Sequence, residues 1–215
     1  MKYIVLLIVS IIIFMTVYIW SLEKNQSKIS KGKTIDLDKN QNTALLIIDM
    51  QNDLTSPRGK MVLDTSQTNK MFDKMNEAIQ YAEKNNWTVI YIQNEYKKNW
   101  VFNKLTNNAM LCQSEGILLD DRLFKIKKGI YLKKHIRDAF SNTKLDSVLS
   151  ENHIGELYIT GIDGKYCVNS TIKGALNRNY QIKIIKDLVV TKDNSELSKL
   201  KTEWLSLGIK EVELK

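Results

Sequence analysis

Three residues in this sequence could combine as a nucleophile, a proton acceptor and a cation. Cys167 stands in the run GIDGKYCV, Asp49 directly follows the aliphatic run ALLII, and Lys134 closes the run IYLKK. A thiol is a nucleophile as its thiolate, and its ordinary pKa of about 8.5 is lowered by a nearby cation or a helix N-terminus. A carboxylate can accept the thiol proton and later return it to a leaving amine. Together these residue types indicate acyl transfer through a cysteine.

Taken singly, each of these residues has a simpler explanation. A cysteine at the start of a helix is more often a small buried hydrophobe, and an aspartate after a strand is often a helix cap. Lysines usually face water. The chemical interpretation depends on all three meeting at one place. Gly161 and Gly164 beside the cysteine would let backbone N–H groups approach a substrate oxygen, as an oxyanion hole requires.

The elements that must position these residues can be read from hydrophobic patterning. Six short apolar or alternating runs predict strands at residues 44–48, 88–93, 130–132, 157–160, 182–185 and 209–214. Amphipathic runs between them predict helices at residues 65–85, 144–150, 168–179 and 195–207. The alternation predicts an α/β fold of the Rossmann-like type, with a doubly wound, mostly parallel six-stranded sheet and helices on both faces.

In such a sheet the ligand crevice lies outside the carboxyl ends of the strands. Asp49, Lys134 and Cys167 all follow predicted strands, so they are expected at this edge. Because side chains alternate along a strand, only one of Lys133 and Lys134 can point inward. Segment 97–128 is less regular and is expected to hold loops, a short helix and part of a pocket wall.

The uncharged run YIVLLIVSIIIFMTVYIW at residues 3–20 predicts one N-terminal transmembrane helix. At 1.5 Å per residue it covers most of the ~30 Å hydrocarbon core of a bilayer. Tyr18 and Trp20 fall where an interfacial aromatic belt lies. A cleaved signal peptide is the alternative, although the run exceeds a usual signal core and no A-x-A-like site follows it. We therefore expect residues 3–20 to have the lipid bilayer as a partner.

The chain divides into an anchor at residues 1–20, a polar lysine-rich linker at residues 21–42 and a catalytic domain at residues 43–215. The linker has no apolar periodicity, which predicts flexibility. Its lysines outnumber Lys2 on the other side of the anchor, so the positive-inside count favours a single-pass membrane protein with a cytoplasmic domain. The opposite orientation stays open.

Charge and cysteine content narrow the set of partners. The net charge of +8 is scattered among acids without a basic stripe, so no nucleic-acid partner is expected, and anionic lipid headgroups explain the excess as well. Cys112 and Cys167 form no CxxC pair, and two histidines are too few for a zinc cluster. A single disulfide stays open. We expect no cofactor and no metal, so activity should survive chelation.

Three blocks, TALLIIDMQNDL, KKHIRDAFSNTKLDSVL and LYITGIDGKYCVNSTIKGALNRNYQIKIIKDLV, resemble in order and spacing the signature blocks of the isochorismatase-like hydrolases. This family includes nicotinamidases and N-carbamoylsarcosine amidase, and the match covers about residues 43–193. The resemblance implies that Asp49, Lys134 and Cys167 are the catalytic residues, which agrees with the choice made from their chemistry.

The resemblance also implies a cis peptide between Ile162 and Asp163, and an oxyanion hole formed by the N–H groups of Asp163 and Cys167. Family members commonly carry Thr-Asp in this loop, where the chain has Gly164 and Lys165. This departure affects the hydrogen bonding of the loop and its substrate contacts.

A second departure concerns metal binding. Metal-binding nicotinamidases carry an Asp-x-His pattern after the second strand, and here the corresponding stretch is Asn94, Glu95 and Tyr96. The substitution argues against a nicotinamidase metal site.

The leading prediction is a membrane-anchored cysteine hydrolase that cleaves a small amide or a related C–N bond through a thioester intermediate. One alternative is an isochorismatase-type vinyl-ether hydrolase, a reaction that some family members perform without the cysteine. Another is a catalytically inactive, membrane-tethered binding module of the same fold. Retention of Cys167 favours the amidase, whereas Gly164 and Lys165 favour the module. The resemblance also implies self-association, so a homo-oligomer stays open.

Overall fold

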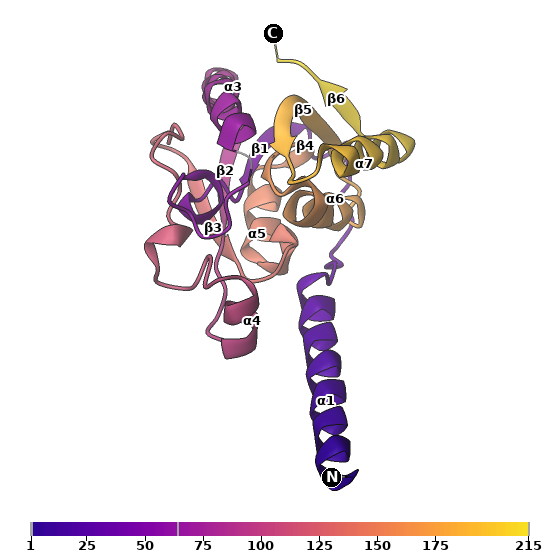
Figure 1. Cartoon of the computed structure of the whole chain (residues 1–215). Helices are drawn as coiled ribbons and strands as arrows, with labels where there is room; N and C mark the ends of the chain where they lie inside the picture. Colours follow the sequence, from indigo (N-terminus) through magenta and orange to yellow (C-terminus); the bar gives the residue numbers. More distant parts are fainter. Residues whose placement is uncertain (1, 64, 215) are drawn as a thin grey trace.

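The computed structural model describes residues 2–63 and 65–214, which form a six-stranded sheet with helices around it (Figure 1). The strands lie in the order β3-β2-β1-β4-β5-β6, and each neighbouring pair is parallel. The predicted α/β fold and its six strands are thereby confirmed. The strands are β1 (Asn42–Ile48), β2 (Thr88–Asn94), β3 (Ile130–Lys134), β4 (Ile154–Ile162), β5 (Gln181–Val190) and β6 (Lys210–Val212).

Helices cover both faces of this sheet. Strand β1 carries apolar side chains on both faces, and each face is buried by packing against helices. Leu46 and Ile48 of β1 pack in one buried cluster with three of the helices, while Leu45 and Ile47 pack in the opposite cluster with Met75 of a fourth. The predicted helices are α3 (Thr65–Lys84) on the second face, and α5 (Lys144–Glu151), α6 (Asn169–Leu176) and α7 (Asn194–Ser206) on the first.

The chain runs outward from β1 to β3 and then crosses to β4, so the strand order reverses between β1 and β4 at the centre of the sheet. Ligand crevices form at such reversal points, outside the carboxyl ends of the strands. Short elements build the loops there: α2 (Asn52–Thr55), α4 (Trp100–Leu105), η1 (Glu115–Ile117), η2 (Ala139–Ser141) and the π-helical turn η3 (Gly164–Val168).

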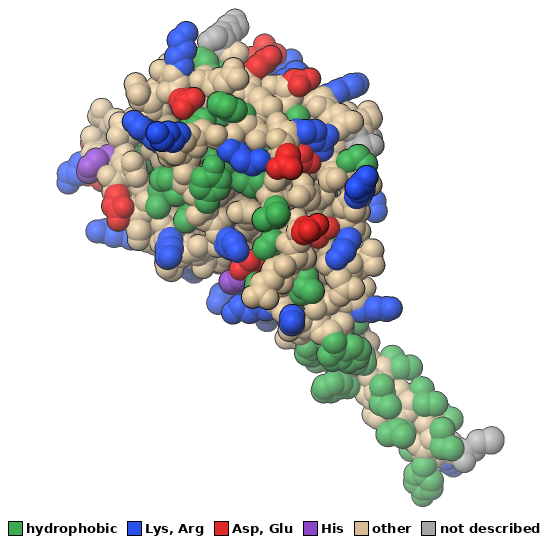
Figure 2. All heavy atoms as spheres, turned by 90° about the vertical axis from the view of Figure 1, so that its left-hand side faces the viewer, with side chains coloured by type: hydrophobic (Ala, Val, Ile, Leu, Met, Phe, Trp, Pro, Cys, Tyr) green, Lys and Arg blue, Asp and Glu red, His purple; other side chains and the backbone are tan. Residues whose placement is uncertain are grey.

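Helix α1 (Lys2–Gln26) projects away from the domain, and none of its residues is buried (Figure 1). Hydrophobic side chains cover its length in the space-filling view (Figure 2), and it is long and apolar enough to cross a membrane. It extends six residues beyond the expected end at Trp20. These additional residues contact the domain. The Arg137 guanidinium pairs with both carboxylate oxygens of Glu23 at 2.5 and 2.9 Å, and the Arg137 backbone N–H donates to the Gln26 carbonyl.

The segment between α1 and β1 packs against the domain, unlike the flexible linker that composition predicts. Ser30 donates from its N–H and its hydroxyl to the Asp138 carboxylate at 2.8 and 2.5 Å. The buried Arg178 guanidinium donates to the Ser30 hydroxyl at 3.2 Å, and the Ile35 side chain packs on the core. These partners lie 108 and 148 residues further along the chain, so no local pattern could reveal them.

We expect a soluble fragment that begins at Ser27 to be more stable than one that begins at Thr43. The shorter fragment takes both Ser30 donors away from Oδ2 of the buried Asp138 carboxylate, and leaving a buried acceptor unsatisfied costs about 1–3 kcal/mol. For a domain of this size, that corresponds to a fall in Tm of about 2–12 °C. Thermal unfolding followed by circular dichroism measures the difference, and Ser30→Ala in the longer fragment should give an intermediate Tm. Equal Tm values for the two fragments would contradict a stabilising role.

Candidate active site

The three residues singled out by their chemistry lie at the carboxyl edge of the sheet. Asp49 follows β1, Lys134 ends β3, and Cys167 lies in η3, the turn that connects β4 to α6. Asp49 has a backbone φ of +55°, a conformation that aspartate tolerates better than most residues. Its N–H donates to the Ile92 carbonyl of β2, which holds the side chain at the centre of the crevice.

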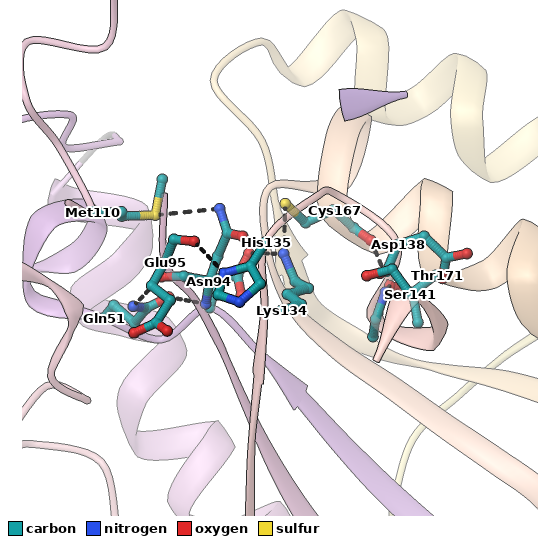
Figure 3. A network of polar contacts seen from close by, with 12 residues as sticks. Gln51, Asn94, Glu95, Met110, Lys134, His135, Asp138, Ser141, Cys167 and Thr171 are labelled. Carbon is teal, nitrogen blue, oxygen red and sulfur yellow. Dashed lines mark hydrogen bonds and ion pairs between the residues drawn. The ribbon is translucent and has the colours of Figure 1, made fainter. Parts of the chain in front are cut away.

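The structure brings these three side chains into direct contact. Lys134 Nζ lies 2.8 Å from Asp49 Oδ2 and 3.2 Å from Cys167 Sγ, so the ammonium bridges the carboxylate and the sulfur. In Figure 3 the dashed line from the Cys167 sulfur ends on the Lys134 amine. The side chains of Asp49 and Lys134 are fully buried. Such a cluster excludes water from the charged groups and strengthens their mutual interaction.

The paired lysines of β3 separate as alternation along a strand requires. Lys134 points into the protein, whereas Lys133 is 53% exposed and pairs with Glu95 at 2.8 Å. Ile130 and Leu132 share the face of Lys134, and this alternation identifies the inward lysine.

Burial sets the protonation state of the cluster. Desolvation raises the pKa of the Cys167 thiol to about 12, and the negative charge of Asp49 raises it as well, while Lys134 opposes both. Desolvation also raises the pKa of Asp49 against the effect of Lys134. Burial disfavours the charged form of Lys134, but the charges of Asp49 and Cys167 outweigh it and raise its pKa.

The pKa of Cys167 is therefore raised, whereas a neighbouring cation alone would lower it. The raised pKa of Cys167 favours a neutral thiol beside the ion pair of Asp49 and Lys134. Asp49 Oδ1 is buried and accepts no hydrogen bond from the described residues. That oxygen is available to receive the thiol proton, and the transfer leaves the net charge of the buried cluster unchanged.

Replacing Lys134 by methionine should raise the pH at which Cys167 is alkylated. Lys134 stabilises the thiolate, and an opposite charge at this distance shifts a pKa by about 1–3 units. The rate of iodoacetamide labelling, followed over a pH range well below the thiol pKa, measures the shift, because the thiolate fraction falls tenfold for each unit by which the pKa rises. Lys133→Met, on the same strand but exposed, is the matched control and should leave the profile unchanged. The double variant Asp49→Asn with Lys134→Met avoids an unpaired buried carboxylate if the single variant folds poorly. A Lys134→Met profile identical to that of the wild type would contradict the assigned contact.

The loop before Cys167 is held by its own hydrogen bonds. The peptide bond between Ile162 and Asp163 is cis. The Asp163 carboxylate accepts from the Lys165 N–H at 2.8 Å and from the Thr191 hydroxyl. Lys165 also pairs with Glu196 of α7 at 3.2 Å. The departure at Gly164 and Lys165 therefore leaves the loop hydrogen-bonded and anchored to its neighbours.

Gly161 supplies the tight packing behind this loop. Its φ is +119°, and a side-chain Cβ placed there would lie 2.1 Å from the Ile48 carbonyl oxygen of β1. Only glycine both adopts this φ readily and leaves room for the Ile48 carbonyl. The ends of β1 and β4 can therefore lie close together, and these ends carry Asp49 and Cys167.

A pocket of about 1300 Å³ opens in front of the cluster. Asp49, Asp163 and Cys167 line it, whereas Lys134 supports them from behind. The expected pocket wall in segment 97–128 is present in the form of residues from α4 and the loop after it. Pocket residues that the sequence did not point to come from three other regions: Glu23 of α1, Lys60–Leu63 after α2, and Arg137, Tyr166 and Thr191–Asn194 around the carboxyl edge.

The side chains at the position of the nicotinamidase metal site do not form a ligand set. Asn94 hydrogen-bonds through its backbone with the buried Gln51 side chain, Glu95 pairs with Lys133, and Tyr96 packs edge-on against Phe102. Within residues 2–63 and 65–214, no three His, Cys, Asp or Glu side chains converge as metal ligands. The residues present therefore do not fit a zinc or iron site.

A doubly wound parallel sheet with a pocket at its carboxyl edge defines an α/β enzyme domain. Residues 43–206 match the family model described as the isochorismatase domain. The chain is 26% identical over 149 residues to the uncharacterized isochorismatase family protein YddQ of Bacillus subtilis, covering 69% of this chain and 78% of that protein. It is 29% identical over 171 residues to the ureidoacrylate amidohydrolase RutB of Klebsiella pneumoniae, covering 68% and 72%.

The solved structure of nicotinamidase PncA from Bacillus subtilis has the same fold, with a TM-score of 0.73 and 23% identity over 81% of this chain and all of that one. The chain belongs to the isochorismatase family and is a hydrolase.

Proposed function

We propose that this protein is a membrane-anchored amidase that cleaves a small amide, or a related C–N bond, through a thioester on Cys167. The sulfur attacks the carbonyl carbon while Asp49 takes the thiol proton. The C–N bond then breaks, and Asp49 passes that proton to the leaving nitrogen. Water next attacks the thioester and gives one proton to Asp49, the C–S bond breaks, and the carboxylic acid leaves as the sulfur regains its proton.

The observation that carries this proposal is the Lys134 ammonium, which bridges Asp49 and Cys167 inside a buried cluster that faces the pocket. Lys134 lowers the pKa of Asp49 against the larger effect of burial, and its positive charge stabilises the thiolate as it forms. RutB and PncA are named for amide hydrolysis, which supports the same reaction class here.

The proposed oxyanion hole consists of the backbone N–H groups of Asp163 and Cys167. Both residues line the pocket, and η3 begins between them, which supports this assignment. Two such donors stabilise the tetrahedral oxyanion more than the ground-state carbonyl, and loss of one typically costs about 10²–10³ in kcat.

The test is a screen of small amides with the purified full-length protein in detergent, followed by mass spectrometry of the protein after rapid acid quench. Turnover with an adduct on the peptide that contains Cys167 supports the proposal. Hydrolysis of a vinyl ether without an adduct would indicate the isochorismatase-type reaction. Binding without any turnover would indicate an inactive binding module.

The membrane anchor is the second part of the proposal. A core helix of a soluble protein would be largely buried, whereas none of the residues of α1 is buried. The contacts of Glu23 and Gln26 with Arg137 favour a retained helix over a cleaved signal peptide. The lysines after the helix favour a domain on the cytoplasmic side.

We expect full-length protein expressed in bacteria to sediment with membranes and to resist alkaline carbonate extraction. A spanning apolar helix is held by hydrophobic burial, which carbonate does not weaken, whereas peripheral electrostatic contacts are released. Immunoblotting of pellet and supernatant measures the partition, and the fragment from Ser27 is the soluble control. A mature N-terminus near Ser21 would establish signal cleavage instead.

A further inference from the structure

The short helix α4 lies on the side of the domain from which α1 emerges (Figure 1). The two helices are in direct contact through Asn99, the residue that caps α4. Asn99 accepts from the Phe102 N–H at 3.0 Å, and its amide donates to the Tyr18 hydroxyl at 2.8 Å. Tyr18 lies near the end of the apolar run of α1, at the level expected for the membrane interface. Helix α4 is therefore fixed at that level as well.

The exposed face of α4 has the composition of an interfacial segment. Trp100 is 77% exposed and Leu105 is 60% exposed, although both are large and apolar. Lys97, Lys98 and Lys104 are exposed around them. Tryptophan at the headgroup level, with lysines beside it, is typical of segments that lie on an anionic bilayer surface. Figure 2 shows Lys and Arg side chains on the domain just above the hydrophobic rod of α1.

Both of these helices contribute residues to the lining of the active-site pocket. Phe102 and Leu105 of α4 line the pocket together with Glu23 of α1. Glu23 follows Tyr18 by five residues, which is about 7.5 Å of helix rise. When α1 spans a bilayer, the part of the pocket lining that α1 and α4 supply therefore lies near the headgroup layer.

The lining of the pocket combines two chemically different sets of side chains. The apolar set comes mainly from α4 and from the segments around α2: Leu54, Met61, Leu63, Phe102, Leu105 and Met110. The charged set includes the pairs Arg137–Glu23 and Lys165–Glu196. A ligand that uses both sets has an apolar chain and a polar head.

We propose that α4 is a second membrane contact and that the pocket takes its substrate, an amide carrying an apolar chain, from the bilayer surface. The substrate half of this proposal rests on the amidase function proposed above. The apolar chain lies along the α4 wall, and the amide carbonyl reaches Cys167 from the headgroup side.

The membrane contact is tested without any activity measurement. Full-length protein is reconstituted into phosphatidylcholine–phosphatidylglycerol vesicles that contain lipids brominated near the headgroup, in a Trp20→Phe background that removes the anchor's signal. Bromine quenches tryptophan fluorescence only at close range. Trp100→Phe should remove the quenched component of the fluorescence. Trp87→Phe should leave that component unchanged, because Trp87 precedes β2 at the amino ends of the strands. Absence of quenching in the Trp20→Phe protein, or quenching that survives Trp100→Phe, overturns the contact.

The substrate class is tested with fatty-acyl p-nitroanilides of increasing chain length in the same vesicles, with Cys167→Ala as the background control. Burial of each added CH₂ is worth ~0.8 kcal/mol, so kcat/KM should rise by up to about fourfold per CH₂ until the pocket is filled. A flat or falling series overturns the substrate class. If no amide is hydrolysed at all, the proposed amidase function and the proposed substrate class are both wrong. The membrane contact of α4 is tested independently by the quenching experiment.

Discussion

Cys167→Ala should abolish amide turnover, with kcat falling by roughly 10⁴- to 10⁶-fold, the range seen when a nucleophile is removed from a catalytic unit. In the proposed mechanism the sulfur forms the covalent bond to the carbonyl carbon, and no other described side chain that lines the pocket offers a thiol. Alanine leaves Asp49 and Lys134 paired, because their 2.8 Å contact does not involve the sulfur. Substrate binding should therefore remain within a few-fold of wild type.

Steady-state kinetics and equilibrium binding of an unreactive amide analogue measure the two effects separately. The matched control is Cys112→Ala, because Cys112 is the other free cysteine and does not line the pocket. It should keep wild-type kcat. Wild-type turnover by Cys167→Ala would falsify the thioester mechanism and favour the vinyl-ether reaction, which needs no nucleophilic cysteine.

Asp49→Asn should lower kcat on amides by about 10²–10⁴, the span typical of general acid–base catalysis. The asparagine keeps the shape of the side chain but cannot accept the thiol proton or return it to the leaving nitrogen. The same substitution removes a negative charge that raises the pKa of Cys167, while Lys134 remains 3.2 Å from the sulfur. The thiolate should then form at lower pH, so alkylation of Cys167 at neutral pH should become faster while amide turnover falls.

This opposite movement of turnover and alkylation distinguishes a proton-transfer role from a structural one. Both are measured on one preparation, with circular dichroism as the check of folding. Asp120→Asn is the matched control, because Asp120 is another buried carboxylate with a cationic partner, Arg122, and does not line the pocket. It should leave the alkylation profile unchanged. Slower alkylation in Asp49→Asn would indicate that the carboxylate acts by holding the cluster together.

The sheet could be predicted from the sequence because its strands carry strong local signals. ALLII is apolar at consecutive positions, as a strand buried on both faces must be, and the Asp that follows it necessarily falls at the carboxyl edge. The contact of Asp49, Lys134 and Cys167 was expected from the same rule. Their catalytic roles remain predictions, to be decided by the variants above.

The features that could not be predicted from the sequence depend on packing between segments that are distant in the chain. Whether a cation lowers a thiol pKa depends on how much water the site excludes, and burial around Cys167 reverses the local expectation. The docking of Ser30 on Asp138 and of Glu23 on Arg137 also joins residues more than 100 positions apart. A polar segment rich in lysine has the composition of a flexible linker, whatever surface it meets after folding.

The state of the cysteines has a consequence for oxidative damage. Both cysteines are free, which answers the question of a disulfide between them. Peroxide oxidises the thiolate far faster than the thiol, and it must reach the sulfur first. Burial raises the pKa of Cys167 and leaves the residue only 7% exposed, so a small thiolate fraction and restricted access should both slow sulfenic acid formation. In the proposed mechanism, burial therefore keeps the nucleophile reduced between turnovers, although no second described cysteine lines the pocket to act as a resolving thiol.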